Sequence, residues 1–309
     1  MSQTPAVQLH FALHFDHPPR NGRALLASLL AGRPAQVSDD PRAVRLEATW
    51  HGARADRASL QRYLQVCELP DDGTLPLLYL HAMAMPLHMA LLSHARFPLR
   101  LLGLVHWGNR IESLRPVRAD EALNLHCTLN GIEATERGQS FAIATTLSMV
   151  GEVVWRETST FLSPAARGKP SGKSGKKPVA DGNEPDWGVP VAQWAVAANA
   201  GRRFAGPSGD WNPIHVSALT ARLFGYPRAI AHGMFSAARC LALLQAGVPT
   251  GQPVTLDLRF KRPLLIPGQV ALYTQQDPQA AGSTRFVLQV QGTGEPHIEG
   301  QLTQGPLTL

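Results

Sequence analysis

Residues 204–234 have the sequence FAGPSGDWNPIHVSALTARLFGYPRAIAHGM. This stretch contains a helical pattern with polar residues on both sides of it. Pro213 suits the first position of a helix, and the asparagine before it is a favourable N-cap. The amphipathic run IHVSALTARLF then predicts a helix that ends at Gly225. A second, apolar helix is predicted where His232 and Gly233 stand. The stretch therefore predicts a short helix, a turn and the start of a long buried helix.

Two residues near the first helix have the chemistry of an acid–base pair. His215 falls in the first turn, where the helix dipole lowers the pKa of an imidazole and keeps it neutral at pH 7. Asp210 lies just before the cap, where the same dipole favours a carboxylate. The break at Asn212-Pro213 allows both side chains to turn toward one point. For an isolated Asp-x-Asn-Pro, a helix cap without catalytic function is the alternative. The longer pattern Gly-Asp-x-Asn-Pro-x-His is not explained by capping alone.

The chain contains the same order of features twice, which indicates an internal repeat. An apolar helix is predicted at residues 79–94 and another at 230–247, which ends at Gly247 as a C-cap. The triplet His-Ala-Met at 81–83 corresponds to His-Gly-Met at 232–234. An Arg-Pro pair follows the histidine after 34 residues in the first half and after 30 in the second.

Each half closes with runs of strand composition bounded by turns. These runs are residues 141–150, 152–162, 254–260, 269–275, 285–292 and 297–304. One apolar helix followed by antiparallel strands is an α+β pattern. A sheet wrapped around a single helix also explains why that helix is apolar on nearly every face.

A segment rich in Pro, Gly, Ser and Lys divides the chain. Residues 164–189 have too few large apolar side chains to offset their ordering entropy, so we expect a flexible basic linker. The predicted domains are 1–163 and 190–309. Without the five cations of this run, the formal charge of +6 falls to +1. A nucleic-acid partner is therefore not expected.

The remaining composition favours a cytoplasmic protein. The cysteines, Cys67, Cys127 and Cys240, are odd in number, far apart and without a CxxC pair, which favours a reducing compartment over disulfides or zinc. The N-terminus has no pattern of a secretory signal, and no apolar stretch is long enough to span a bilayer. No membrane association is expected.

At residues 209–215 and 232–234 the sequence resembles the MaoC-like family of (R)-specific enoyl-CoA hydratases, also called hydratase 2. Its members carry G-D-x-N-P-x-H followed by H-G-[ML]. The resemblance implies a double hot dog fold, in which each half wraps an antiparallel sheet around one long helix. It implies a hydro-lyase of fatty acid metabolism that interconverts trans-2-enoyl and (3R)-hydroxyacyl thioesters. The acyl group would be carried by CoA or acyl carrier protein, and no metal or redox cofactor is expected.

The resemblance also implies roles for individual residues. Asp210 and His215 would activate the water and exchange protons with C2 and the C3 oxygen, while Asn212 would orient the pair. The backbone N–H of Gly233 would donate to the thioester carbonyl, which gains negative charge in the transition state. The first half has Ala82 in place of this glycine and lacks the acid–base motif, so it is expected to be silent. Such a half leaves space for a longer acyl chain around Met85 and Met89.

Further residues are candidates for substrate contacts: His232, Met234, Ser236, Trp211, Arg228, Arg259 and Lys261. Ser236 has packing as its alternative, and Trp211 either shapes the pocket or is structural. The three basic residues could reach the phosphates of CoA or phosphopantetheine, or line a solvated surface. Three histidines, His81, His88 and His94, lie among Met, Leu and Ala, which favours core positions over a metal site.

Two other functions stay open from the sequence. Hot dog folds also host thioesterases, which attack the carbonyl carbon and do not act at C3. A non-catalytic acyl-thioester-binding protein would keep the fold and lose the acid–base pair. These patterns do not specify the acyl chain length, the reaction direction, the carrier or the oligomeric state. Two fused halves allow either a monomer or a homodimer.

Overall fold

The computed structural model describes residues 9–19, 44–165, 186–244, 251–277, 280 and 282–305. Its strands are β1 (Leu9–Phe15), β2 (Val44–Ala53), β3 (Val105–Ser113), β4 (Leu123–Asn130), β5 (Glu133–Thr135), β6 (Gly138–Met149), β7 (Glu152–Pro164), β8 (Ala192–Val196), β9 (Val254–Phe260), β10 (Gly268–Gln276), β11 (Ser283–Val290) and β12 (Pro296–Gln304). Its helices are α2 (Arg57–Cys67), α3 (Tyr79–Leu92), α4 (Ala200–Ser208), α5 (Pro213–Val216), α6 (Ala218–Arg222) and α7 (Gly233–Leu243).

The strands form one continuous sheet, in which the two halves of the chain lie edge to edge. The order is β1-β2-β4-β6-β7-β3-β9-β12-β11-β10-β8, with β5 paired to β6. Strands β3 and β9 pair antiparallel and form the seam between the halves. The predicted α+β double hot dog is therefore confirmed, with the two sheets fused into one. The expectation of purely antiparallel sheets was wrong at one edge, because β1 pairs parallel to β2.

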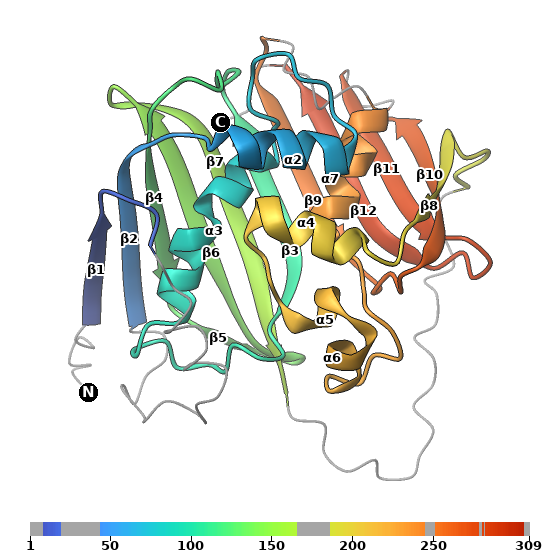
Figure 1. The fold of residues 1–309 in the computed structure, drawn as a ribbon, viewed down its shortest axis with the longest axis horizontal. Coiled ribbons are helices and arrows are strands. Elements are labelled where there is room, and N and C mark those ends of the chain that lie inside the picture. The colour runs from blue at the N-terminus through green and yellow to red at the C-terminus, as the bar shows by residue number, and fades with distance from the viewer. Residues whose placement is uncertain are drawn as a thin grey trace, which may run out of the picture.

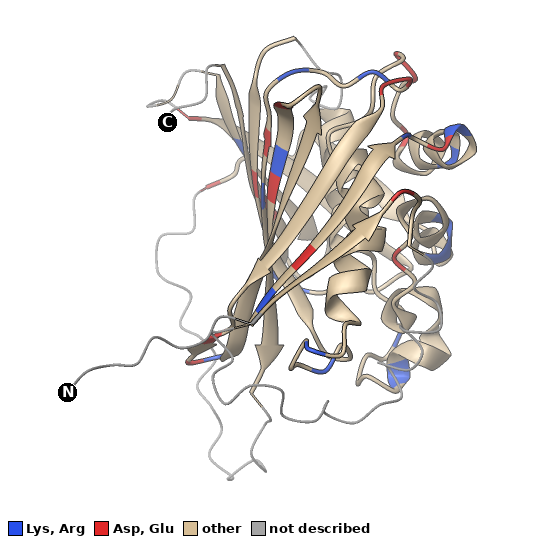
Figure 2. Ribbon diagram, turned by 90° about the vertical axis from the view of Figure 1, so that its left-hand side faces the viewer, with Lys and Arg blue, Asp and Glu red and all other residues tan. Residues whose placement is uncertain are grey.

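The helices of the described residues lie on one face of the sheet (Figures 1 and 2). Helix α3 crosses the strands of the first half, and α7 crosses those of the second half. The strands alternate to suit this arrangement: in β9, Leu256 and Leu258 are buried toward the helices, while Asp257 and Arg259 point to the other face. Apolar side chains of the sheet and of the central helices thus form one contiguous core.

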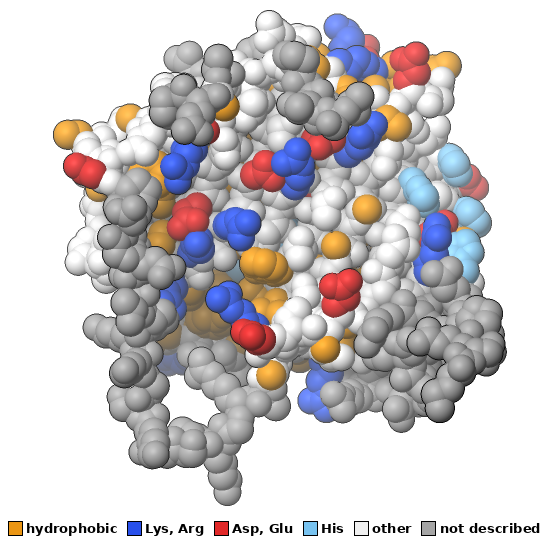
Figure 3. All heavy atoms as spheres, turned by 180° about the vertical axis from the view of Figure 1, so that it is seen from behind, with side chains coloured by type: hydrophobic (Ala, Val, Ile, Leu, Met, Phe, Trp, Pro, Cys, Tyr) orange, Lys and Arg blue, Asp and Glu red, His pale blue; other side chains and the backbone are white. Residues whose placement is uncertain are grey.

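The opposite face of the sheet carries charged side chains of both signs (Figure 3). Arg110 of β3 pairs with Asp257 of β9 at 2.7 Å, across the seam, and with Glu112 at 3.2 Å. Arg156 lies 3.7 Å from the same Glu112. The signs alternate, so this face has no extended field of one charge that would attract a polyanion.

The central helices differ from the predictions at their ends. Helix α7 begins at Gly233 and not at Ile230, because Ile230 pairs with Leu265 in a β-bridge. Its expected C-cap, Gly247, lies outside the described residues. Helix α3 is buried over most of its length, as expected, but two of its buried side chains are the histidines His81 and His88.

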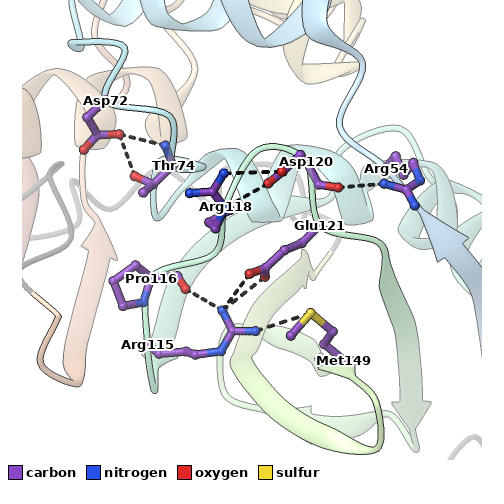
Figure 4. A network of polar contacts seen from close by, with 9 residues as sticks. All are labelled: Arg54, Asp72, Thr74, Arg115, Pro116, Arg118, Asp120, Glu121 and Met149. Carbon is purple, nitrogen blue, oxygen red and sulfur yellow. Dashed lines mark hydrogen bonds and ion pairs between the residues drawn. The ribbon is translucent and has the colours of Figure 1, made fainter.

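The Arg-Pro turns have the same structural task in both halves, which supports the internal repeat. In the first half, the Leu75 N–H ahead of α3 donates to the Val117 carbonyl, and in the second, the Ala231 N–H ahead of α7 donates to the Leu264 carbonyl. Arg115 stabilises the first turn by donating to the Pro116 carbonyl and pairing with Glu121 (Figure 4).

The helices of the two halves are in contact above the sheet. Arg239 of α7 is buried, donates to the Cys67 carbonyl at the end of α2, and pairs with Glu68 at 2.6 Å. The Tyr63 ring of α2 lies 5.6 Å from the Phe204 ring of α4. The first half is therefore in direct contact with the segment that precedes Asp210.

The predicted linker falls mostly outside the described residues. The predicted linker 164–189 covers residues 166–185, which the structure does not describe, so the domain boundaries stay predictions. No helix among the described residues combines the length and the apolar character that a bilayer crossing requires. The three cysteines are buried and free.

Candidate active site

Asp210 is placed by the abrupt end of α4. Gly209 caps this helix with a left-handed backbone (φ 75°), a conformation that favours glycine. The chain then turns, and the Asp210 side chain accepts the backbone N–H of Asn212 at 3.1 Å. About one third of the carboxylate side chain is exposed (34%). The carboxylate is thus held by the backbone and still accessible to a ligand.

Asn212 and Pro213 begin a helix, as predicted, but that helix is a single turn. The Asn212 side chain accepts the Ile214 N–H at 3.4 Å, with Pro213 at the first position. The expected continuous helix up to Gly225 was wrong. Ser217 has an extended backbone and caps a second short helix by accepting the Thr220 N–H. This break separates α5 from α6.

His215 is buried beneath this turn and held in one tautomer. Its Nδ1–H donates to the Ile230 carbonyl at 2.9 Å, since a carbonyl oxygen only accepts. The other ring nitrogen, Nε2, is then an acceptor. Gly201 of α4 supports the arrangement, because a Cβ at this position would overlap the His215 carbonyl oxygen.

His232 completes the cluster. Its Nε2–H donates to the Asp210 backbone carbonyl at 3.0 Å, and its ring stacks on His215 at 3.8 Å between centroids. The Phe204 ring lies 5.0 Å from it on another side. His232 therefore connects the start of α7 to the Asp210 loop. One ligand-type atom from each of Asp210, His215 and His232 lies within 4.8 Å of the others.

The electrostatics favour an ionised Asp210 and neutral imidazoles. Burial lowers the pKa of His215, against the opposing effect of Asp210. Burial likewise lowers the pKa of His232 to about 3. For Asp210, desolvation acts to raise the pKa, but His232, His215 and the Asn212 N–H outweigh it, and the net shift is downward. The direction predicted for His215 is confirmed, with burial as its cause, since the α5 helix is too short to supply much dipole.

Gly233 is the first residue of α7, and its N–H lies in the part of a helix that has no intrahelical acceptor. Within the described residues no protein acceptor is recorded for this N–H. A Cβ at Gly233 would lie 2.5 Å from two atoms of the Phe260 ring. The glycine is therefore required by the packing of Phe260, and its N–H is free to bind a carbonyl oxygen.

Known proteins resemble both the sequence and this arrangement. The MaoC-like domain model matches residues 187–291. The 3-hydroxyacyl-thioester dehydratase X of Mycobacterium tuberculosis is 31% identical over 246 residues, which are 79% of this chain and 84% of the relative. The chain belongs to the MaoC-like family.

Solved structures agree with this assignment. A crystal structure of the same mycobacterial dehydratase has a TM-score of 0.70 at 31% identity, covering 84% of this chain and 99% of that one. A MaoC-like dehydratase from Phytophthora capsici has a TM-score of 0.63 at 16% identity, covering 88% and 98%, and shares the fold. The MaoC-like match includes Asp210, His215 and Gly233.

The other residues predicted for this MaoC-like site differ in their burial and in their contacts. Met234 is buried at the start of α7, next to Gly233. Ser236 is buried and bonded to His297 at 3.0 Å, which favours packing over substrate contact. Trp211 lies inside the motif but is 55% exposed, at the surface of the Asp210 turn.

The structure does not bring the three basic candidates into the cluster. Arg228 donates to the Pro267 carbonyl at 3.1 Å. Arg259 points to the face of the sheet opposite the helices, because its neighbours Leu258 and Phe260 face them. Lys261 pairs with Glu299 at 2.9 Å. These side chains line a solvated surface, and phosphate contacts by them stay a prediction.

Among the described residues, two groups have the atom types and spacing that a metal ion could bridge. One is Asp210, His215 and His232, and the other is His81, His88 and Glu157. In the first group, one nitrogen of each histidine already donates to a carbonyl. The second group is bonded internally through His81 and Glu157 at 2.6 Å. The expectation of a metal-free site stays a prediction.

Several residues that shape the site were missed from the sequence. Phe260 beneath Gly233, Gly201 against His215, and the Ile230 carbonyl all act through tertiary contacts. The core positions predicted for His81 and His88 are confirmed, but the contact between His81 and Glu157 of β7 was not predicted.

The pKa shifts predict how activity depends on pH. The active form has Asp210 ionised and His215 neutral, and both pKa values lie below their ordinary values. Acidification therefore leaves kcat/KM flat from pH 8 down to about 6.5, the ordinary pKa of histidine, and lowers it only below that. Initial rates with an enoyl thioester across this range measure the profile, and a midpoint at or above pH 6.5 contradicts the assignment.

This measurement needs a control for unfolding in acid. Burial lowers the pKa of His88 and His297 to about 4 and that of His106 to about 3. The unfolded chain thus binds protons that the folded chain does not, so stability is lost as pH falls below about 6.5. Circular dichroism at each pH separates loss of the fold from titration of the active site.

Proposed function

We propose that this protein is a hydro-lyase that adds water to a trans-2-enoyl thioester and, in reverse, dehydrates a (3R)-hydroxyacyl thioester. The proposal rests on one observation: Asp210 and His215 each have a ligand-type atom within 4.8 Å of the other and of His232, the residue directly before Gly233 at the start of α7. The named relative, a 3-hydroxyacyl-thioester dehydratase, supports the same reaction class.

The residues suggest a division of roles. The thioester carbonyl accepts the Gly233 N–H, which stabilises the negative charge that develops on its oxygen when C3 is attacked. Asp210 and His215 hold the water, take one of its protons as its oxygen bonds to C3, and a proton is delivered to C2. The balance is one water consumed for one double bond. Asn212 orients the pair through its backbone N–H to Asp210.

This chemistry uses only groups of the chain. We therefore propose a site without metal or redox cofactor, because proton transfer and a carbonyl-polarising donor are sufficient for the reaction. The substrate is carried by CoA or acyl carrier protein. A cytoplasmic location belongs to the same proposal and is supported by the three free, buried cysteines. A homodimer is a further prediction, tested by light scattering.

The alternatives predict different chemistry at the same cluster. A thioesterase would direct water at the carbonyl carbon and release a thiol. A binding protein would leave the thioester unchanged. The acid–base pair is complete and its imidazole is neutral, which favours the hydratase over both.

One experiment separates the three functions. We expect purified protein incubated with crotonyl-CoA or a longer trans-2-enoyl-CoA to lose the absorbance of the conjugated thioester without releasing thiol. Chiral chromatography of the product tests for the (3R) configuration. Release of thiol identifies a thioesterase, and unchanged absorbance with measurable binding identifies a binding protein.

A further inference from the structure

A second buried polar cluster lies in the first half, where no catalytic motif was predicted. His81 of α3 donates its Nδ1–H to Glu157 of β7 at 2.6 Å. Asn109 of β3 donates to the same carboxylate oxygen at 2.6 Å and to Ser159 at 3.1 Å. All four side chains are almost completely buried. This part of the core therefore contains an ion pair surrounded by hydrogen bonds.

The cluster adjoins the candidate active site across the seam. Met85 follows His81 by one helical turn and thus shares its face of α3. The Met85 Cγ lies 3.8 Å from the position of a Cβ on Gly209, the residue before Asp210. His106 stacks on His81 at 5.8 Å and lies 4.9 Å from Phe260, whose ring lies beneath Gly233. Both ends of the catalytic cluster are therefore next to residues that contact His81.

His81 and His232 occupy equivalent positions in the repeat but use opposite ring nitrogens. His232 donates from Nε2 to the Asp210 carbonyl, whereas His81 donates from Nδ1 to Glu157. Within the described residues no hydrogen bond is recorded for the His81 Nε2. Burial acts to lower the pKa of His81, but Glu157 and Asp210 outweigh it and raise the pKa. The protonated ring therefore carries a second N–H, at Nε2, that can donate a hydrogen bond.

The cluster has further hydrogen-bonding capacity that the described protein does not use. The Glu157 Oε2 and the Asn109 Oδ1 are buried and have no partner in the described structure. A buried ion pair is often no more stable than apolar residues of the same volume. Stability alone thus gives no reason for this polar cluster beside a site for an acyl chain.

We propose that His81 is a specificity residue, whose Nε2–H donates a hydrogen bond to an uncharged oxygen, a hydroxyl or keto group, on the acyl chain of the thioester. The inference rests on the proposed function, because it assigns the position beyond C3 to the first half. An uncharged oxygen is favoured over a carboxylate, since Glu157 and Asp210 both place negative charge nearby.

The test compares matched enoyl thioesters. One is trans-2-octenoyl-CoA, others have the same length with a hydroxyl or keto group at successive carbons beyond C4, and one ends in a carboxylate. We expect wild-type kcat/KM to be roughly 10- to 100-fold higher for at least one oxygenated substrate than for the plain chain, as a charge-assisted hydrogen bond gives.

Variants then assign this preference to His81. His81→Leu is expected to abolish the ratio, and His81→Gln, which keeps a neutral donor, to restore part of it. His94→Leu is the control, because His94 lies just past the end of the same helix and its ring contacts Phe11, and its ratio is expected to match wild type. The ratio cancels a general loss of folded enzyme.

The outcomes separate this inference from the proposed function. A wild-type ratio near one at every position, a ratio unchanged in His81→Leu, or a preference for the carboxylate overturns the role of His81 while leaving hydration of octenoyl-CoA intact. If wild type hydrates none of the substrates, including the plain chain, the proposed function fails, and the inference falls with it.

Discussion

Asp210→Asn and His215→Ala are each expected to lower kcat by about 10²- to 10⁴-fold, the usual contribution of a positioned acid or base. Asparagine preserves the shape that accepts the Asn212 N–H and removes only the negative charge. Alanine removes the Nε2 acceptor of His215. Steady-state hydration of an enoyl-CoA measures both effects. The double variant is expected to lose little more than either single one, because residues that act as a unit are not additive.

Matched substitutions on the sheet control for nonspecific effects. Asp257→Asn changes a half-exposed carboxylate on the face away from the helices, and His126→Ala changes an exposed histidine. Both are expected to keep activity close to wild type. Nearly full activity in Asp210→Asn or His215→Ala, in folded protein, would refute the acid–base assignment and place the catalytic groups elsewhere in the protein.

Gly233→Ala is expected to reduce kcat/KM by roughly 10- to 100-fold while leaving every polar side chain of the cluster in place. The added methyl would lie 2.5 Å from the Phe260 ring, so either the ring or the start of α7 must move. Such overpacking destabilises a protein by about 1–3 kcal/mol. A displaced Gly233 N–H also loses its alignment with the carbonyl, which is the basis of an oxyanion site.

A double-variant comparison distinguishes this clash from other causes. Phe260→Ala opens the space that the methyl needs, so Gly233→Ala is expected to cost much less activity in that background than in wild type. Gly206→Ala in α4 is the control, since an added Cβ there meets no atom within 4 Å. Equal losses in both backgrounds would mean that Phe260 does not explain why this position is glycine.

The two halves of the chain differ in the polar side chains near their central helices. The second half holds the proposed acid–base pair, while the corresponding histidine of the first half, His81, belongs to a buried ion pair. The first half also contacts the elements that carry the site. The Tyr63 ring packs near Phe204 of α4, and the Cys67 carbonyl at the end of α2 accepts a hydrogen bond from Arg239 of α7. The space for a longer acyl chain around Met85 and Met89 stays a prediction. Bulky substitutions at these positions would test it by their effect on activity with long acyl thioesters.

The sequence by itself determined the local parts of this protein. Asn212 and Pro213 mark a helix start because capping and a fixed φ are properties of neighbouring residues. Strands β6, β7 and β9 to β12 and both central helices could be predicted from composition and period for the same reason. The motif also identified Asp210, His215 and Gly233 as the candidate site, since their spacing is local.

Only the tertiary structure decided which distant groups meet. The fusion of two sheets at β3 and β9, the Phe260 ring beneath Gly233, and Glu157 beside His81 join residues far apart in the chain. Hydrogen bonds, desolvation and excluded volume depend on distances in space, which no spacing along the sequence specifies. For that reason the residues of the site could be named in advance, while their tautomers and the polar cluster across the seam could not.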